Sequence, residues 1–108
     1  MDARRGRLPR LGFGVVRGRS MEPTLYDGDR LLLAHGAAPR VGRLAVVRLP
    51  DGVVAVKRVV RREAGGWWVE RDNPAVGVDS WTVGALPDEA VVARVLCRVL
   101  PVRRGVRN

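Results

Sequence analysis

Short runs of β-branched and other apolar residues, separated by turn-forming Gly, Pro and Asp, extend through this 108-residue chain. This pattern favours β-strands over helices, because valine-rich runs bounded by such residues suit a pleated, half-buried surface. We expect strands near residues 13–17, 29–35, 43–49, 53–62, 66–71, 79–83 and 91–99. The sequence therefore predicts a mostly β protein.

Two turn signals organise the centre of the chain. Pro50-Asp51-Gly52 and Gly65-Gly66 predict a three-stranded antiparallel meander over residues 43–71, with Lys57 on its middle strand. Side chains alternate between the two faces of a strand, so Lys57 shares a face with Ala55 and other apolar neighbours. We expect its amine to be partly shielded from water.

Length and composition predict one domain. A chain of this length with 46% hydrophobic residues can bury a single core. We expect a basic N-terminal arm over residues 1–12, one domain over 13–101 and a basic tail over 102–108. No apolar run is long enough to span a membrane, no export signal is recognised, and the single cysteine allows no internal disulfide. Cytoplasmic location is the resulting expectation.

The formal net charge of +9 comes from arginines scattered along the chain. Without a recognition helix, a zinc pattern or interleaved aromatic residues, the charge does not predict nucleic-acid binding. Peripheral contact of the basic ends with a membrane stays open. Cys, His and Asp lack metal-ligand spacing, so we expect neither a metal nor another cofactor.

Lys57 is the single lysine beside nineteen arginines. A desolvated lysine can lose its proton near neutral pH, whereas arginine stays charged in proteins. Ser20 is expected to begin one short helical turn, whose free backbone N–H groups could hold an oxyanion. We therefore hypothesise a dyad in which Ser20 attacks a carbonyl and Lys57 accepts its proton.

Other interpretations of these residues stay open at this point. A Ser-His-Asp triad would need His35, which lies in a loop-like stretch without an evident orienting partner. Ser20 could be only a helix cap, and Lys57 only an exception to an arginine-rich composition. Cys97 resembles a small buried apolar residue more than a nucleophile.

The order of motifs from about residue 13 to residue 100 resembles the type I signal peptidase family. The motifs are Gly18–Leu25, Asp27-Gly28-Asp29, Val41–Val47, Val56–Val60, Asp72-Asn73-Pro74 and Val78-Asp79-Ser80. The resemblance implies a catalytic core of antiparallel sheets forming a partly open barrel, with a short helical turn after the nucleophile. It also implies Ser20 as nucleophile, Lys57 as general base, and supporting roles for Asp72, Asn73, Asp79 and Ser80.

Three positions depart from that family's pattern. Gly18 stands where some members have a hydroxyl for the oxyanion hole, which leaves mainly backbone donors such as the Ser20 N–H. Gly77 replaces a serine that orients the lysine in some members, and Trp81 replaces an arginine. The groups that support Lys57 are therefore expected to differ from those of an anchored signal peptidase.

Within that family, the arginine-rich chain with Trp67–Pro74 and Val78–Gly84 is most similar to the maturation proteases of nickel-containing superoxide dismutase. This likeness implies a soluble endopeptidase that removes an N-terminal leader from the dismutase precursor in the cytoplasm. Two alternatives are a non-catalytic β module that binds peptides or acidic partners, and a relative of the self-cleaving repressor proteases. The latter is disfavoured because no DNA-binding domain or internal cleavage segment is recognised.

An extended substrate is expected to bind beside the nucleophile by strand addition. We expect the backbone of residues 15–18 and the edge near residues 57–60 to hold it, with side-chain pockets lined partly by Met21 and Val59.

Overall fold

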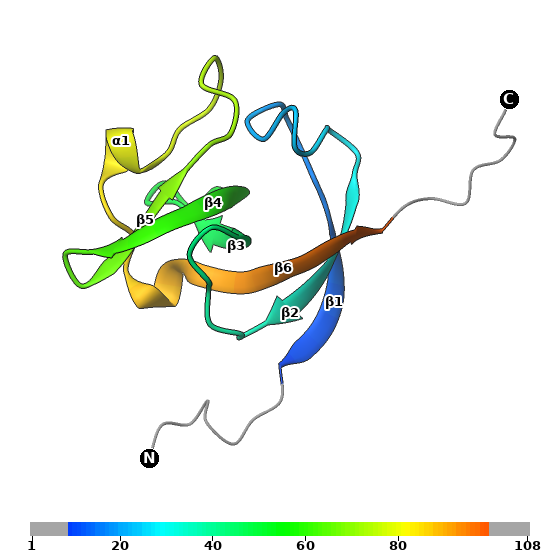
Figure 1. Ribbon diagram of the computed structural model, residues 1–108, viewed down its shortest axis with the longest axis horizontal. Helices are drawn as coiled ribbons and strands as arrows, with labels where there is room; N and C mark the ends of the chain where they lie inside the picture. Colours follow the sequence, from blue (N-terminus) through cyan, green and yellow to red (C-terminus); the bar gives the residue numbers. More distant parts are fainter. Residues whose placement is uncertain (1–8, 100–108) are drawn as a thin grey trace, which may run out of the picture.

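The computed structural model describes residues 9–99, so most of the expected N-terminal arm and the whole expected tail lie outside the described residues. Six strands and two short helices make up the fold (Figure 1). They are β1 (Arg10–Val15), β2 (Arg30–His35), β3 (Leu44–Arg48), β4 (Val54–Glu63), β5 (Gly66–Glu70), α1 (Ser80–Val83), η1 (Asp88–Ala90) and β6 (Val91–Val99). Within this part of the chain, no helix is long and apolar enough to cross a membrane.

All six strands belong to one antiparallel sheet with the order β1-β2-β6-β3-β4-β5. The two end strands, β1 and β5, do not pair, so the sheet stays open. The prediction of a mostly β, antiparallel and incompletely closed fold is confirmed. The central meander is confirmed as well, since β4 lies between β3 and β5.

Residues 79–83 do not form the predicted strand, and that prediction was wrong. They contain the one-turn helix α1, which Asp79 caps by accepting a hydrogen bond from the Trp81 N–H at 3.0 Å. Aspartate is a favoured N-cap residue, and the turn satisfies N–H groups that a strand would need a neighbour to satisfy. The mixture of Trp, Thr and Val had suggested a strand.

A hydrogen-bonded turn over residues 20–25 follows Ser20, and it contains a cis peptide bond between Glu22 and Pro23. The Leu25 N–H donates to the Met21 carbonyl at 2.9 Å, which closes the turn. Met21 and Leu25 point into the protein, where they are 2% and 4% exposed. This turn is therefore fixed by burial of its apolar side as well as by its hydrogen bond.

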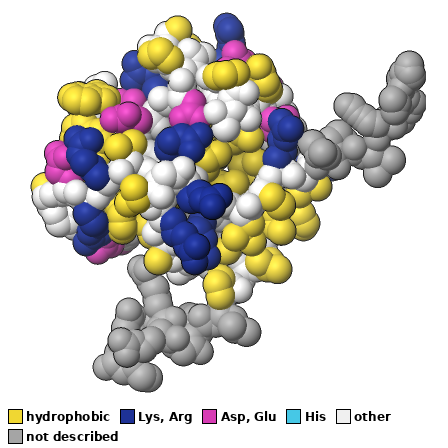
Figure 2. Space-filling view, viewed as in Figure 1, with side chains coloured by type: hydrophobic (Ala, Val, Ile, Leu, Met, Phe, Trp, Pro, Cys, Tyr) yellow, Lys and Arg dark blue, Asp and Glu magenta, His cyan; other side chains and the backbone are white. Residues whose placement is uncertain are grey.

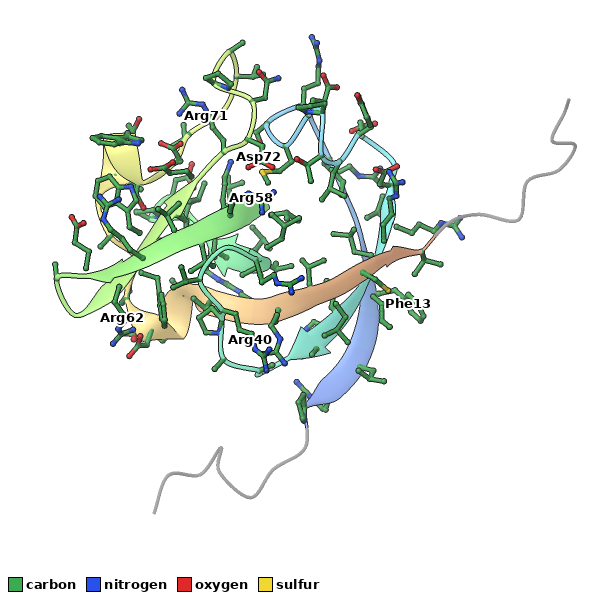
Figure 3. The ribbon with its side chains drawn as sticks, viewed as in Figure 1. Phe13, Arg40, Arg58, Arg62, Arg71 and Asp72 are labelled. Atoms are coloured by element: carbon green, nitrogen blue, oxygen red, sulfur yellow. The ribbon has the colours of Figure 1, made fainter. Side chains whose placement is uncertain are left out.

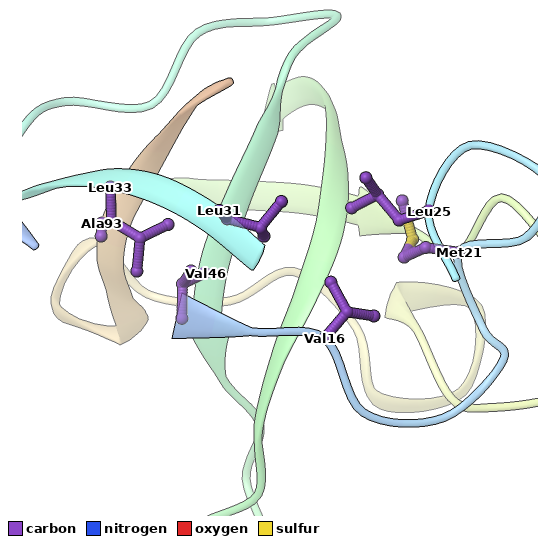
Figure 4. Close-up of a cluster of buried hydrophobic side chains, with 7 residues drawn as sticks. All are labelled: Val16, Met21, Leu25, Leu31, Leu33, Val46 and Ala93. Carbon is purple, nitrogen blue, oxygen red and sulfur yellow. The ribbon is translucent and has the colours of Figure 1, made fainter. Parts of the chain in front are cut away.

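The core consists of two apolar clusters. The first joins the turn after Ser20 to the sheet and contains the residues labelled in Figure 4, which are Val16, Met21, Leu25, Leu31, Leu33, Val46 and Ala93. The second lies along the central meander and comprises Ala45, Val47, Leu49, Val59, Val69 and Leu86. The first cluster anchors the Ser20 segment, and the second anchors the strand that carries Lys57.

Candidate active site

Ser20 and Lys57 meet although 37 residues separate them in sequence. Ser20 lies just after β1, and Lys57 lies on β4. The Lys57 Nζ donates to the Ser20 Oγ at 3.2 Å. With the proton on the oxygen and the amine neutral, the same contact would let Lys57 accept the serine proton, which is the geometry a nucleophile and its base require.

Lys57 is only 2% exposed. It lies opposite the fully buried Ala45 on the neighbouring strand β3. Burial lowers the pKa of Lys57 below its ordinary value, the Asp79 carboxylate opposes that shift, and the Arg71 guanidinium adds to it. Desolvation therefore favours the neutral amine.

Asn73 holds the Ser20 segment in place. Its side-chain amide donates to the Arg19 carbonyl at 2.9 Å, and its backbone N–H donates to the Ser20 carbonyl at 2.8 Å. These two bonds tie the loop after β5 to the loop after β1, and Figure 1 shows the two loops side by side. Asn73 thus fixes the backbone on both sides of the Ser20 amide.

Asp72 forms a second link between the same parts. It accepts two hydrogen bonds from the Arg58 guanidinium, at 2.9 and 2.7 Å, and a third from the Thr24 hydroxyl. Figure 3 shows Arg58, from the middle of β4, close to Asp72. Hydrogen bonding to Arg58, chiefly, holds the pKa of Asp72 below its usual value. The ion pair connects the loop after β5 to β4, and the Thr24 hydroxyl connects it to the turn after Ser20.

Asp79 and Ser80 are buried and have structural contacts. Besides capping α1, Asp79 accepts the Arg71 backbone N–H at 3.0 Å, and its carboxylate lies 3.2 Å from the Arg71 guanidinium. The Ser80 Oγ accepts the Val69 N–H at 2.9 Å. Both residues fasten α1 to β5 and the start of the following loop.

The two glycines noted in the sequence occupy different places around Ser20. The Gly18 N–H donates to the Asp27 carboxylate at 2.7 Å, so it is already engaged, whereas the Ser20 N–H has no partner among the described residues. A Cβ on Gly77 would lie 2.7 Å from the Ser20 Cβ and 3.7 Å from the Lys57 Nζ. Gly77 therefore packs directly against the pair.

A cavity of about 270 Å³ opens beside Ser20. It lies between the end of β1 and the start of β4 and is lined mainly by aliphatic side chains. Its lining includes Gly14, Val15, Val16, Arg17, Ser20, Met21, Val54, Ala55 and Val56. Figure 2 shows that apolar side chains cover much of one face of the molecule and that Lys and Arg side chains are scattered among them.

The structure places Met21 in this cavity wall but Val59 elsewhere. Val59 is fully buried in the second core cluster and pairs with Val69 of β5. Because β5 pairs with β4 from Arg58 onward, the edge over residues 57–60 is largely covered. The open part of that edge is the preceding segment, Val54–Val56, for which the described residues provide a strand partner on one side only.

His35 and Cys97 lie apart from the Ser20–Lys57 contact. His35 ends strand β2 instead of lying in a loop, and it lines another part of the cavity. Cys97 is exposed, contrary to its expected burial, because β6 extends beyond the core there and Leu96 and Arg98 are exposed too. The apolar composition around Cys97 had suggested a core position.

Sequence reasoning did not single out Thr24 or Arg71, and it considered Arg58 only as a cation close to Lys57, not as the partner of Asp72. Arg58 follows Lys57 on the opposite face of β4, and Thr24 lies in the turn after Ser20, so only the fold brings them to Asp72. The Arg71 contact with Asp79 likewise depends on the path of the loop between them. In a sequence with nineteen arginines, nothing marks Arg58 or Arg71 as residues with a particular partner.

A mostly β fold that presents a serine hydroxyl beside an apolar cavity is compatible with the serine peptidase class. The family model described as Peptidase S24-like matches residues 9–95. The chain therefore belongs to the Peptidase S24-like family, and this membership supports a serine peptidase function. The match also supports the signal-peptidase resemblance at the level of the superfamily. No curated protein matched the chain.

Proposed function

We propose that this protein is a Ser-Lys endopeptidase with Ser20 as nucleophile and Lys57 as general base. The observation that carries the proposal is the 3.2 Å contact between the Ser20 Oγ and a lysine amine that is 2% exposed. A buried amine with a lowered pKa can be neutral at a pH where an exposed lysine is charged. It can then do what histidine does in a Ser-His-Asp triad.

The reaction would proceed through an acyl-enzyme. Lys57 accepts the Ser20 proton as the Oγ attacks the substrate carbonyl, and the Ser20 N–H stabilises the resulting oxyanion. Protonated Lys57 then gives that proton to the leaving amine, and the peptide C–N bond breaks. In the second half, Lys57 accepts a proton from water, the hydroxide attacks the Ser20 ester, and return of the proton to Oγ releases the carboxylic product.

The substrate would lie as an extended strand in the cavity beside Ser20. Val16 uses its own backbone to bond the 27–29 turn, since its N–H donates to the Asp29 carbonyl and its carbonyl accepts from the Gly28 N–H, both at 2.8 Å. Backbone groups alternate in direction along an extended segment, so those of Val15 and Arg17 face the other side. That side and the open edge of Val54–Val56 border the cavity.

For the physiological reaction we propose removal of an N-terminal leader in the cytoplasm, with the nickel superoxide dismutase precursor as substrate. The support is the likeness of Trp67–Pro74 and Val78–Gly84 to the corresponding maturation proteases. The family match is compatible with this substrate without specifying it.

Incubation with a proteome-derived peptide mixture tests the peptidase proposal without assuming the natural substrate. Wild type should generate new peptide termini detectable by mass spectrometry, Ser20→Ala should generate none, and Thr82→Ala, which alters an exposed hydroxyl on α1, should act like wild type. Equal cleavage by Ser20→Ala would contradict the nucleophile. Absence of cleavage by folded wild type would favour the non-catalytic peptide-binding module.

The dismutase precursor is tested in a parallel incubation. Leader removal by wild type supports the substrate assignment. Cleavage of peptides without cleavage of the precursor would overturn that assignment and leave the peptidase proposal standing.

A further inference from the structure

A carboxylate, that of Asp79, and a guanidinium, that of Arg71, act on the charge of the Lys57 amine. Asp79 is 2% exposed, and its carboxylate favours the charged form of Lys57. A cation that engages that carboxylate would therefore add to the effect of burial and favour the neutral amine. The Asp79 side chain also has a structural role, because it caps α1 and accepts the Arg71 backbone N–H.

Arg71 provides the opposing charge from the loop after β5. Its guanidinium lies 3.2 Å from the Asp79 carboxylate and also donates to the Pro74 carbonyl at 2.9 Å. A Cβ on Gly77 would lie 3.6 Å from the Arg71 Cδ and 3.7 Å from the Lys57 Nζ. The Arg71 and Lys57 side chains thus both lie close to Gly77, which is next to Ser20.

We propose that Arg71 is a positioning residue for the dyad, which pairs with the Asp79 carboxylate and keeps that charge from stabilising a protonated Lys57. This inference rests on the proposed Ser-Lys function. Arg71 would then support Lys57 in a chain that has Gly77 and Trp81 where some members of the resembled family have polar residues.

The contacts of Arg71 support a fixed position for its guanidinium. The Arg71 Nε is buried without a hydrogen-bond partner among the described residues. An unpaired buried donor is unfavourable, so the side chain is held there by its other contacts. Those contacts are Asp79 and Pro74, which direct the charge toward the carboxylate.

Lys57 gives a direct test because it is the single lysine of the chain. Protein labelled with ¹³C at lysine Cε has one lysine signal, and its pH titration reports the protonation of Lys57 without requiring cleavage. Arg71→Gln should move the titration midpoint to higher pH. Arg71→Gln combined with Asp79→Asn should move it back toward wild type, because both opposing charges are then absent.

Arg62→Gln is the matched control, because Arg62 is paired with Asp88 on the surface and its loss changes net charge equally. It should leave the midpoint unchanged. Arg71→Met retains the apolar stem and should shift the midpoint in the same direction as Arg71→Gln, which covers the case in which the glutamine variant folds poorly.

A midpoint that stays at the wild-type pH in Arg71→Gln and Arg71→Met overturns the inference, as does a shift equal to that of Arg62→Gln. In the cleavage assay, Arg71→Gln should lose roughly threefold to tenfold in kcat/KM at neutral pH and regain it at higher pH. A loss that is uniform across pH would indicate a merely structural role. If the midpoint shifts as expected but wild type cleaves no peptide, the proposed function fails while the charge pairing remains.

Discussion

At the scale of single residues, the arrangement around Ser20 depends on one residue having no side chain. Gly77 has a φ of +93°, and a Cβ there would lie 2.7 Å from the Ser20 Cβ. A contact this short forces one of the two segments to move. Glycine at position 77 therefore allows the loop to approach the nucleophile.

Gly77→Ala should impair cleavage far more than its backbone strain explains. We expect roughly 100-fold loss of kcat/KM, because displacement of a nucleophile by about 1 Å has that order of effect. Gly52→Ala is the matched control, since Gly52 has a φ of +91° and a Cβ there meets nothing within 4 Å. Each variant should lose about 1–3 kcal/mol of unfolding free energy. Equal kcat/KM in the two variants would show that contact with Ser20 is unimportant.

At the scale of elements, the cavity is bordered by two strand segments that are not neighbours in the sheet. The segment after β1 uses the Val16 backbone to bond the 27–29 turn, and the start of β4 has β3 on one side. Each segment therefore has one side available for a peptide. Binding between two such edges would fix the substrate carbonyl relative to Ser20.

Arg17→Pro tests this mode of binding. Proline removes the Arg17 N–H, so a substrate acceptor would lose its partner and kcat/KM should fall roughly tenfold. Arg17→Ala removes the side chain but keeps the N–H, and it should retain most activity if the backbone carries the interaction. Circular dichroism would verify that both variants fold. The same loss in both variants would assign the effect to the guanidinium and contradict strand addition at this position.

The elements also indicate where sequence reasoning succeeds. The meander was predictable because Pro50-Asp51-Gly52 and Gly65-Gly66 are local turn signals, and alternation along β4 then placed Lys57 on a buried face. The helix α1 was missed because its single turn has no periodicity, and only the Asp79 cap signals it. Val59 was placed beside the substrate because alternation gives the face of a residue but not which strand covers its edge.

At the scale of the whole molecule, the open six-stranded sheet holds the Ser20 segment and Lys57 on different parts of one framework. Ser20 directly precedes Met21 of the first core cluster, and Lys57 lies two residues before Val59 of the second. Asn73, Asp72 and their partners connect the two regions. These long-range contacts could not be predicted from composition, because they depend on how the loop after β5 folds back over the nucleophile.

The central claim is that position 57 requires an amine that can become neutral. The most direct measurement compares peptide cleavage by Lys57→Arg with that by Lys57→Cys before and after aminoethylation. The cysteine variant is prepared in a Cys97→Ala background, alkylated with 2-bromoethylamine while unfolded, and then refolded. Alkylation places a primary amine on a chain of nearly lysine length. Unalkylated protein and protein carried through the refolding steps without reagent are the controls.

We predict that Lys57→Arg and unalkylated Lys57→Cys cleave no peptide although both fold, and that aminoethylation restores cleavage. Arginine keeps the positive charge but cannot act as a base, so its inactivity would separate proton transfer from simple electrostatics. Cleavage by Lys57→Arg at the wild-type rate would contradict the account.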